Sequence, residues 1–268
     1  MYQKAYGILE TLSPLHVGAT AGEESGNLNL IFRDQFTQTG IIPGSSLRGR
    51  FRAEMRFRDG QDENEWYGNE AKSGVPDSTT ESRVKFEYAS IVWLPVFCPG
   101  QPVVWVSCPR LLQRYQRIAE ISEELPEVYT ASHALHAPQI DGQYKLFFNF
   151  GFLKIGDKTN LKAWFPDGKE RPAVIVADDE IGMIHDMALY RQSRVKLSND
   201  EKKVDGGAFF NTEALPENTI LVFPVAVRKQ EDLRNWSPFG ENTTDKDEMY
   251  FGGLESIGFG HCLVMLHR

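Results

Sequence analysis

The sequence has few cysteines, no long hydrophobic run and no excess of basic residues. Its three cysteines, Cys98, Cys108 and Cys262, form no C-x-x-C pair, which excludes a zinc ribbon and a disulfide framework and favours a reducing compartment such as the cytoplasm. No apolar run approaches the ~18 residues that a membrane span needs, so we expect no membrane partner. The 29 lysines and arginines are outnumbered by 37 acidic residues, which argues against indiscriminate binding to nucleic acid unless basic residues gather in one patch.

What the sequence does contain is enough apolar residues for a large core. Of its 268 residues, 41% are hydrophobic and 25% are charged, which is typical of a globular protein. Folding at this length buries roughly three quarters of the chain's surface, so stability needs no disulfide or metal. Strand and helix patterns are interspersed without regular βαβ alternation, which predicts an antiparallel α+β fold. We expect a single domain over residues 1–268.

Two local patterns give specific expectations about single elements. The periodicity after Pro109 predicts a helix that begins there, with Ser107 or Cys108 as its cap. The apolar stretch at residues 220–227 reads as a strand, in which Pro224 indicates an edge position or a bulge.

The segment from Gly44 to Arg58 carries the first functional signal. Ser45 and Ser46 are predicted to cap a helix here, because serine at a helix start accepts hydrogen bonds from free backbone N–H groups. Apolar residues repeat at i, i+4 and i+8, and arginines repeat beside them. The apolar residues are Leu47, Phe51 and Met55, and the arginines are Arg48, Arg50, Arg52, Arg56 and Arg58. Guanidinium groups suit phosphate oxygens, so this local positive charge indicates a repeated anionic backbone as partner.

Other readings of this segment are open. Residues 44–49 have the Gly-x4-Gly spacing of a phosphate loop, but Arg50 and Phe51 stand where such a loop has Lys and Ser/Thr, so nucleotide hydrolysis is not expected. A glycine turn, two hydroxyls and a helix N-terminus can still hold an anionic oxygen. The alternative is a capped helix with a solvated basic face.

Glycine is also dense at residues 252–260, near the last predicted strand. This run opens onto a strand rather than a helix, so it is not read as a dinucleotide-binding fingerprint. It permits close approach of another backbone, of protein or of nucleic acid, or makes a compact turn.

His133 and His136 stand too close together for one helical face and are interpreted as surface residues. His16 either orients a reacting group or packs at a strand end.

Several segments together resemble the signature segments of the RAMP superfamily of CRISPR-associated proteins. Those segments are residues 15–18 (LHVG), 42–49 (IPGSSLRG) and 252–260 (GGLESIGFG). Further stretches are similar to the backbone subunit of Cmr-type (type III-B) effector complexes, and they are residues 89–96, 104–111, 193–197, 205–210 and 215–219. The resemblance extends from residue 12 to the end and leaves mainly residues 59–82 and 120–190 unmatched.

The resemblance implies a fold and a set of partners. The fold is a ferredoxin-like, RRM-related antiparallel sheet core with helical insertions, in which residues 59–82 are a variable insertion, 194–219 a protruding thumb hairpin, and 250–268 the glycine loop and last strand. Several copies would stack along a CRISPR RNA, together with other subunits of the effector complex. Each thumb would displace a nucleotide, so that complementary target RNA is held in kinked segments for antiviral defence.

The resemblance and the arginine pattern together assign the RNA contacts. Family contacts carry over to the start of the arginine-rich helix and to the glycine loop, and the predicted thumb adds two basic residues. The predicted RNA-binding residues are Gly44, Ser45, Ser46, Arg48, Arg50, Arg52, Arg56, Arg194, Lys196, Gly252, Gly253, Gly258 and Gly260.

The family's catalytic aspartate, which supports metal-dependent cleavage of target RNA, has no counterpart where the resemblance places it. Counting back from Gly44, the corresponding position is Leu28, and leucine neither binds a divalent ion nor accepts a proton. We therefore expect this subunit to bind guide and target but to cleave poorly, with no tightly bound cofactor. Mg²⁺ or another divalent ion is expected only if the nuclease is active. Weak candidates for a displaced site are His16, Glu24 and Asp34.

Three alternatives stay open. One is an active, metal-dependent endoribonuclease that cleaves target RNA. Another is a guide-independent endonuclease of the same superfamily that processes CRISPR RNA with His16 as general base. The third is a plain RRM-like RNA-binding module, which should carry an RNP-type strand of stacking aromatics that the sequence does not show.

Overall fold

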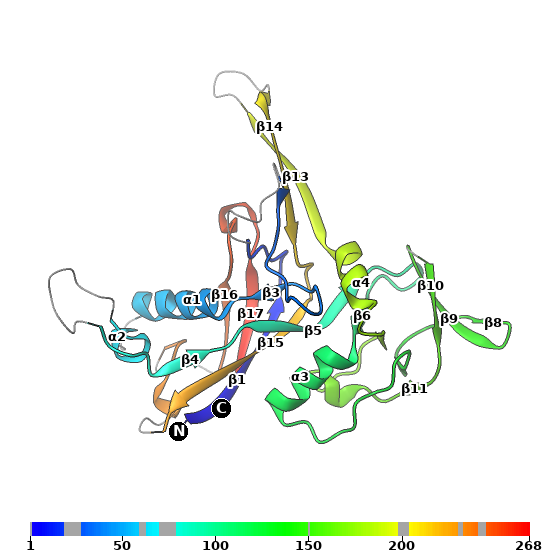
Figure 1. Cartoon of the computed structure of the whole chain (residues 1–268), viewed down its shortest axis with the longest axis horizontal. Coiled ribbons are helices and arrows are strands. Elements are labelled where there is room, and N and C mark those ends of the chain that lie inside the picture. Colours follow the sequence, from blue (N-terminus) through cyan, green and yellow to red (C-terminus); the bar gives the residue numbers. More distant parts are fainter. Residues whose placement is uncertain are drawn as a thin grey trace.

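Within the described residues, eleven strands form a large mixed sheet at the centre of the protein (Figure 1). The computed structural model describes residues 2–18, 28–58, 63–69, 79–149, 151–197, 204–229, 233–240 and 245–268. The strands of this sheet are β1 (Tyr2–Thr11), β3 (Ile41–Ile42), β4 (Val84–Phe86), β5 (Ala89–Val96), β6 (Val104–Ser107), β7 (Ala131–Ser132), β11 (Lys158–Thr159), β12 (Ala173–Ile175), β15 (Ile220–Arg228), β16 (Lys246–Tyr250) and β17 (His261–His267). They lie in the order β11-β7-β12-β6-β5-β15-β1-β17-β16, with β3 beside β5 and β4 beside β15.

Both faces of the sheet's centre are covered. Every residue of β5 is buried, as expected of a strand with no solvent-facing side. Successive residues of β15 alternate between two buried clusters, of which one contains Leu221 and Phe223 and the other Ile220 and Val222. Helix α1 (Gly44–Phe57) packs into the first cluster, and helix α3 (Pro109–Ala119) contributes to both. The ring of Phe51 on α1 lies 5.3 to 6.1 Å from five other aromatic rings.

The α+β class is confirmed, but the sheet is mixed where an antiparallel sheet was expected. The pairs β12–β6 and β11–β7 are parallel. Parallel neighbours need a long connection that crosses from one end of the sheet to the other. Helix α3 lies on the connection from β6 to β12, which provides this crossover.

Pro224 does not mark a sheet edge, so the edge alternative of the prediction is wrong. It lies inside β15, opposite Tyr6 of β1, and β15 has neighbours on both sides. The backbone N–H of Glu87 donates to the Pro224 carbonyl at 3.2 Å. Because N–H and C=O of one residue face the same side of a strand, the missing donor of Pro224 faces the interruption between β4 and β5. The sheet therefore loses no regular ladder bond there.

Two smaller sheets extend from the body (Figure 1). One contains β8 (Gln139–Ile140), β9 (Gln143–Phe148) and β10 (Gly151–Ile155), and the other contains β13 (Tyr190–Leu197), β14 (Val204–Ala214) and β2 (Leu28–Asn29). The remaining helical segments are α2 (Glu63–Tyr67), α4 (Ile181–Ala188), η1 (Lys162–Trp164), η2 (Leu233–Asn235) and η3 (Glu255–Ile257). No helix of the described residues is both long enough and apolar enough to cross a membrane.

The start of α1 differs from the predicted one, whereas the start of α3 agrees with it. The N-cap of α1 is Pro43, with no side-chain cap, so Ser45 and Ser46 lie inside the first helical turn. The serine-cap prediction is wrong because the chain enters the helix one residue before Ser45. Helix α3 begins at Pro109 after Cys108, as the fixed φ of proline favours.

Candidate functional site

A groove runs between α1 and the glycine loop that precedes β17. Its lining is built from small residues of α1 at Ser46, Gly49 and Ala53, which share one helix face, and from Arg50 beside them. The volume of the hollow is about 430 Å³. We call it the α1 groove, and its lining residues are Val17, Gly18, Ser46, Gly49, Arg50, Ala53, Tyr250, Gly252 and Glu255. Missing side-chain bulk on α1 leaves room for a ligand against the helix backbone.

Arg50 is the member of the arginine cluster that lines the α1 groove. Its Nη2 donates to Glu54 at 2.7 Å, whereas its buried Nε has no hydrogen-bond partner in the structure. A buried donor without a partner carries a free-energy cost, which an anionic oxygen in the groove would offset.

The other predicted arginines of α1 point toward α2. Arg48 donates to the carbonyl of Tyr67, Arg52 donates to Asn64 Oδ1 at 2.9 Å, and Arg56 donates to Glu63 Oε1 at 3.0 Å. The cluster read from the sequence is therefore divided between two sides of the helix. Whether these three arginines also contact RNA stays a prediction.

At two positions in the glycine loop, glycine is needed because another part of the same chain packs against its backbone. Gly252 has φ +77°, and a Cβ there would lie 2.1 Å from the His16 carbonyl oxygen; Gly260 has φ +85°, and a Cβ there would lie 2.2 Å from the Phe251 carbonyl oxygen. The backbone that approaches these glycines is thus the protein's own. A Cβ at Gly49 or Gly253, in contrast, would meet no atom within 4 Å. Protein packing does not demand glycine at those two positions.

Four other predicted contact residues differ in what the structure shows of them. Gly44 packs against β4, because a Cβ there would lie 2.6 Å from the Phe86 carbonyl oxygen. Arg194 is half-buried on β13. Gly258 has φ +91° and lies at the end of η3. The side chain of Lys196 lies outside the described residues. RNA contact by these four residues stays a prediction.

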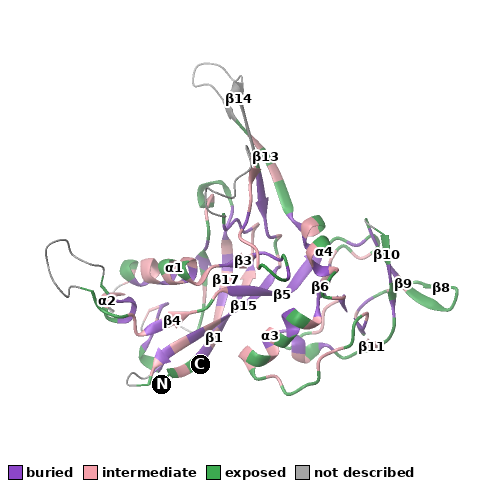
Figure 2. Ribbon diagram, in the orientation of Figure 1, coloured by how far each residue is buried: buried purple, intermediate pink, exposed green. Residues whose placement is uncertain are grey.

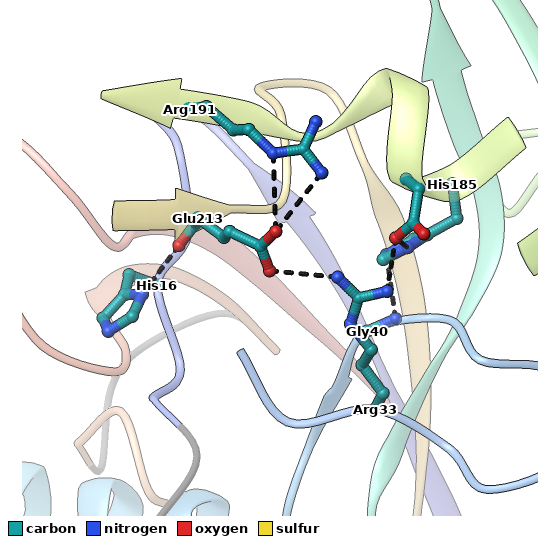
Figure 3. Close-up of polar contacts among 7 residues, drawn as sticks. His16, Arg33, Gly40, His185, Arg191 and Glu213 are labelled. Carbon is teal, nitrogen blue, oxygen red and sulfur yellow. Dashed lines mark hydrogen bonds and ion pairs between the residues drawn. The ribbon is translucent and has the colours of Figure 1, made fainter. Parts of the chain in front are cut away.

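A second cluster of polar side chains lies at the base of the β13–β14 pair (Figure 3). The buried carboxylate of Glu213 accepts from Arg33 Nη2 at 3.0 Å and from Arg191 Nη2 at 3.2 Å. Arg33 also donates to Asp186 on α4. His16 donates from Nδ1 to the Glu213 backbone carbonyl at 2.7 Å, and this hydrogen bond fixes the proton on Nδ1.

His185 completes this cluster in a neutral form. Its Nε2 accepts from the Gly40 backbone N–H at 2.9 Å, so its ring proton is on Nδ1. Burial lowers the pKa of His185 to about 3, the charges of Arg33 and Arg191 add to this effect, and Asp186 opposes it. No sequence pattern indicated this cluster, because its members come from residues 16–40 and 185–213, two segments that lie more than one hundred residues apart.

Those candidate catalytic residues that the structure describes are not brought together as a metal site. Leu28 pairs with Asn211 at the base of β14, and it is half-buried. The Oδ1 of Asp34 accepts hydrogen bonds from Phe36 N, Thr37 N and Thr37 Oγ1 at 2.8 to 3.0 Å, so it holds its own loop. Glu24 lies outside the described residues. Within those residues, no group of three or more histidine, cysteine or acidic side chains is placed to hold a metal.

His133 and His136 are exposed, which confirms their interpretation as surface residues.

Comparison with known proteins identifies a family and similar folds. A family model described as the RAMP superfamily matches residues 8–262. No curated protein matches the sequence. A crystal structure of Cmr4 is 18% identical to this chain, with a TM-score of 0.67 and coverage of 99% of both chains.

Two further solved structures are similar over nearly the whole chain. A chain in the cryo-EM structure of the type III-B Cmr-beta complex bound to cognate target RNA is 17% identical, with a TM-score of 0.71 and coverage of 98% of this chain and 97% of that one. Oligomeric Cmr4 from Pyrococcus furiosus is 19% identical in its crystal structure, with a TM-score of 0.68 and coverage of 99% of this chain and 98% of that one. At these identities the likeness establishes the fold.

Proposed function

Because the chain belongs to the RAMP superfamily, we propose that it is an RNA-binding backbone subunit of a type III CRISPR effector complex. It binds CRISPR RNA, stacks with further copies of itself and with other subunits, and holds complementary target RNA. Structures of similar fold include an oligomeric Cmr4 and a Cmr complex bound to cognate target RNA. The three cysteines are free and buried, which suits the reducing cytoplasm.

The observation that carries this proposal is the α1 groove. Ser46, Gly49 and Ala53 leave the helix surface open, and Arg50 places a guanidinium beside that opening. A polynucleotide backbone supplies repeated phosphate oxygens to such a surface. The groove therefore suits the guide backbone better than a nucleotide, since the phosphate-loop lysine is absent.

The proposal includes the finer fold assignment that the family implies. The core is ferredoxin-like, and the pair β13–β14 acts as the thumb. Its support is the position of this pair, which extends away from the large sheet (Figure 1) and has Leu28 beside its base.

The groove is tested by two substitutions at one position. Gly49→Glu adds a carboxylate to the groove, and Gly49→Ala adds only a methyl group; neither Cβ meets another atom. We expect Gly49→Glu to weaken guide binding at least about tenfold, because it repels phosphate, while Gly49→Ala keeps binding. Fluorescence anisotropy with labelled CRISPR RNA measures both. Equal affinity of Gly49→Glu and the wild type would overturn the proposal.

Target RNA is bound without cleavage at this subunit. Asp34 is used by its own loop, Glu213 is held between two arginines, and leucine stands at position 28. The described residues around Leu28 therefore do not fit Mg²⁺, which needs oxygen ligands that are free to coordinate.

A cleavage assay on labelled complementary RNA, with the assembled complex and Mg²⁺, tests this point. We expect no regularly spaced products from the wild type and their appearance with Leu28→Asp. Products from the wild type that vanish with Glu24→Gln or Asp34→Asn would show an active nuclease. Cleavage of CRISPR repeat RNA by the isolated chain, lost in His16→Ala, would instead support the processing endonuclease.

A further inference from the structure

The outer face of the β9–β10 hairpin carries two exposed aromatic rings. Phe147 pairs with Phe152 across the two strands, and their ring centroids lie 6.0 Å apart. The Phe147 residue is 41% exposed and the Phe152 residue 51%. Figure 2 shows exposed stretches on this small sheet.

The hairpin does not need the exposed rings of Phe147 and Phe152 in order to fold. Its inner face already packs into the main core, through Leu146, Phe148, Leu153 and Ile155, all of which are buried. The outer face of a strand pair with one buried side normally carries polar residues. Single exposed apolar residues are common, but two adjacent aromatic rings on one open face point to a ligand.

Two lysines occupy the next cross-strand position on the same face. Lys145 pairs directly with Lys154, and like charges in this position are destabilising. Lys145 lies 3.6 Å from the exposed carboxylate of Asp141 and 5.5 Å from the centre of the Phe152 ring. Lys154 is exposed and makes no ion pair with the described residues. The Asp141 carboxylate already balances Lys145, whose side chain is 18% exposed, so Lys154 is the cation of this pair that is open to an added anion.

We propose that this face, which we call the β9–β10 face, is a second binding surface for single-stranded RNA. Its four residues are Lys145, Phe147, Phe152 and Lys154. Bases stack on the two phenylalanine rings, and a phosphate lies at the exposed Lys154, which is the combination of groups that binds single strands irrespective of sequence. Charge complementarity favours this occupant, because Lys154 is exposed beside the two rings and makes no ion pair with the described residues.

This surface is separate from the α1 groove. Helix α1 and the sheet β8–β10 lie on opposite sides of the central sheet along the longest axis of the molecule (Figure 1). RNA bound at one place does not require contact at the other, so the inference stands apart from the proposed guide contact. A flexible strand that extends beyond the guide groove would have this second point of attachment.

The experiment measures binding of a fluorescein-labelled oligouridylate to the full chain by anisotropy. Gly49→Glu serves as the parent, because it blocks the α1 groove and leaves the β9–β10 face to be measured. In that parent, Phe147→Ala with Phe152→Ala should weaken binding at least about tenfold through loss of stacking. Phe147→Trp with Phe152→Trp should retain it. Thermal melting of each variant verifies that the chain is folded.

The charge contribution has a matched control. Lys154→Glu should weaken binding, whereas Lys169→Glu, the same change at another exposed lysine, should not. Cross-linking of 4-thiouridine RNA should label the peptide over residues 143–155. Unchanged affinity of the double alanine variant, or equal effects of the two lysine variants, would overturn the proposal. So would loss of RNA-free self-association without loss of RNA affinity, since the face would then join two copies of the chain.

Discussion

Glu213 is the residue that joins the β13–β14 pair to the body of the protein. Its carboxylate is buried and lies between Arg33 and Arg191 (Figure 3). Removal of one partner from such a pair leaves the other charge unbalanced. We expect Glu213→Gln to lower the free energy of unfolding by about 3 kcal/mol, measured by urea denaturation.

A matched control for this change is Glu248→Gln. Glu248 pairs with His261 at 2.9 Å, but its side chain is 59% exposed. Water screens such pairs, so this substitution should cost less than about 1 kcal/mol. Equal effects of the two substitutions would mean that Glu213 contributes nothing beyond an ordinary surface pair.

His185 makes the stability of the protein depend on pH. Its folded pKa of about 3 lies below the ordinary value of 6.5. Between these two pH values, His185 is protonated in the unfolded chain and neutral in the folded chain. The contribution is complete above pH 6.5 and is lost as the pH falls toward 3. In that window the free energy of unfolding should fall more steeply in the wild type than in His185→Gln, by about 1.4 kcal/mol per pH unit.

Urea denaturation at a series of pH values measures this slope. The exposed residue His133 provides the control, because His133→Gln should leave the slope unchanged. Parallel pH profiles of His185→Gln and the wild type would contradict the assigned role of His185.

At the scale of single residues, local sequence patterns predicted features of neighbouring residues but not contacts between residues far apart in the chain. The glycines at 252 and 260 were expected to admit a neighbouring backbone, and they do, but the neighbours are His16 and Phe251 of the same chain. A sequence pattern shows that space is needed without showing what fills it. The contact of Arg33 with Glu213 joins residues 180 positions apart, so no local spacing could have predicted it.

Among the elements, α3 was predictable and the surroundings of β15 were not. Proline at the first turn and apolar periodicity are local properties, and they define α3. The central place of β15 depends instead on its neighbours β1 and β4, which come from distant parts of the chain. Pro224 is tolerated only because β4 and β5 are interrupted beside it.

Helix α2 depends on α1 for its stability. A helix of five residues is unstable alone, and α2 is held by hydrogen bonds from Arg48 and Arg52 and by the buried Trp66 and Tyr67. We expect Arg48→Gln with Arg52→Gln to increase hydrogen exchange over Glu63–Tyr67, measured by mass spectrometry. The same variant should weaken guide binding less than Arg50→Gln does. A larger loss of binding than with Arg50→Gln would instead place these two arginines on the RNA.

At the scale of the whole molecule, the net charge of −8 does not prevent cations from standing at both of the surfaces proposed to bind RNA. One is the α1 groove with Arg50, and the other is the β9–β10 face with its paired lysines. The acidic residues elsewhere on the chain repel phosphate, so we expect RNA to bind at these two surfaces rather than at random.

The proposed stacking predicts that assembly depends on RNA length. Sedimentation of the wild type with CRISPR RNAs of increasing length should give complexes whose mass rises in steps of one protein, since each added segment of backbone admits one more copy. Gly49→Glu should remove these steps while Gly49→Ala keeps them. A mass that does not change with RNA length would argue for a single RNA-binding module.

The pairing of β1 has a consequence for synthesis. This strand is synthesised well before its neighbours β15 and β17, which are contributed by Ile220–Arg228 and His261–His267. During most of translation both edges of β1 therefore lack their partners, and the centre of the sheet closes only after the last strand has emerged. Removal of β17 should therefore leave one edge of β1 unpaired and open to aggregation.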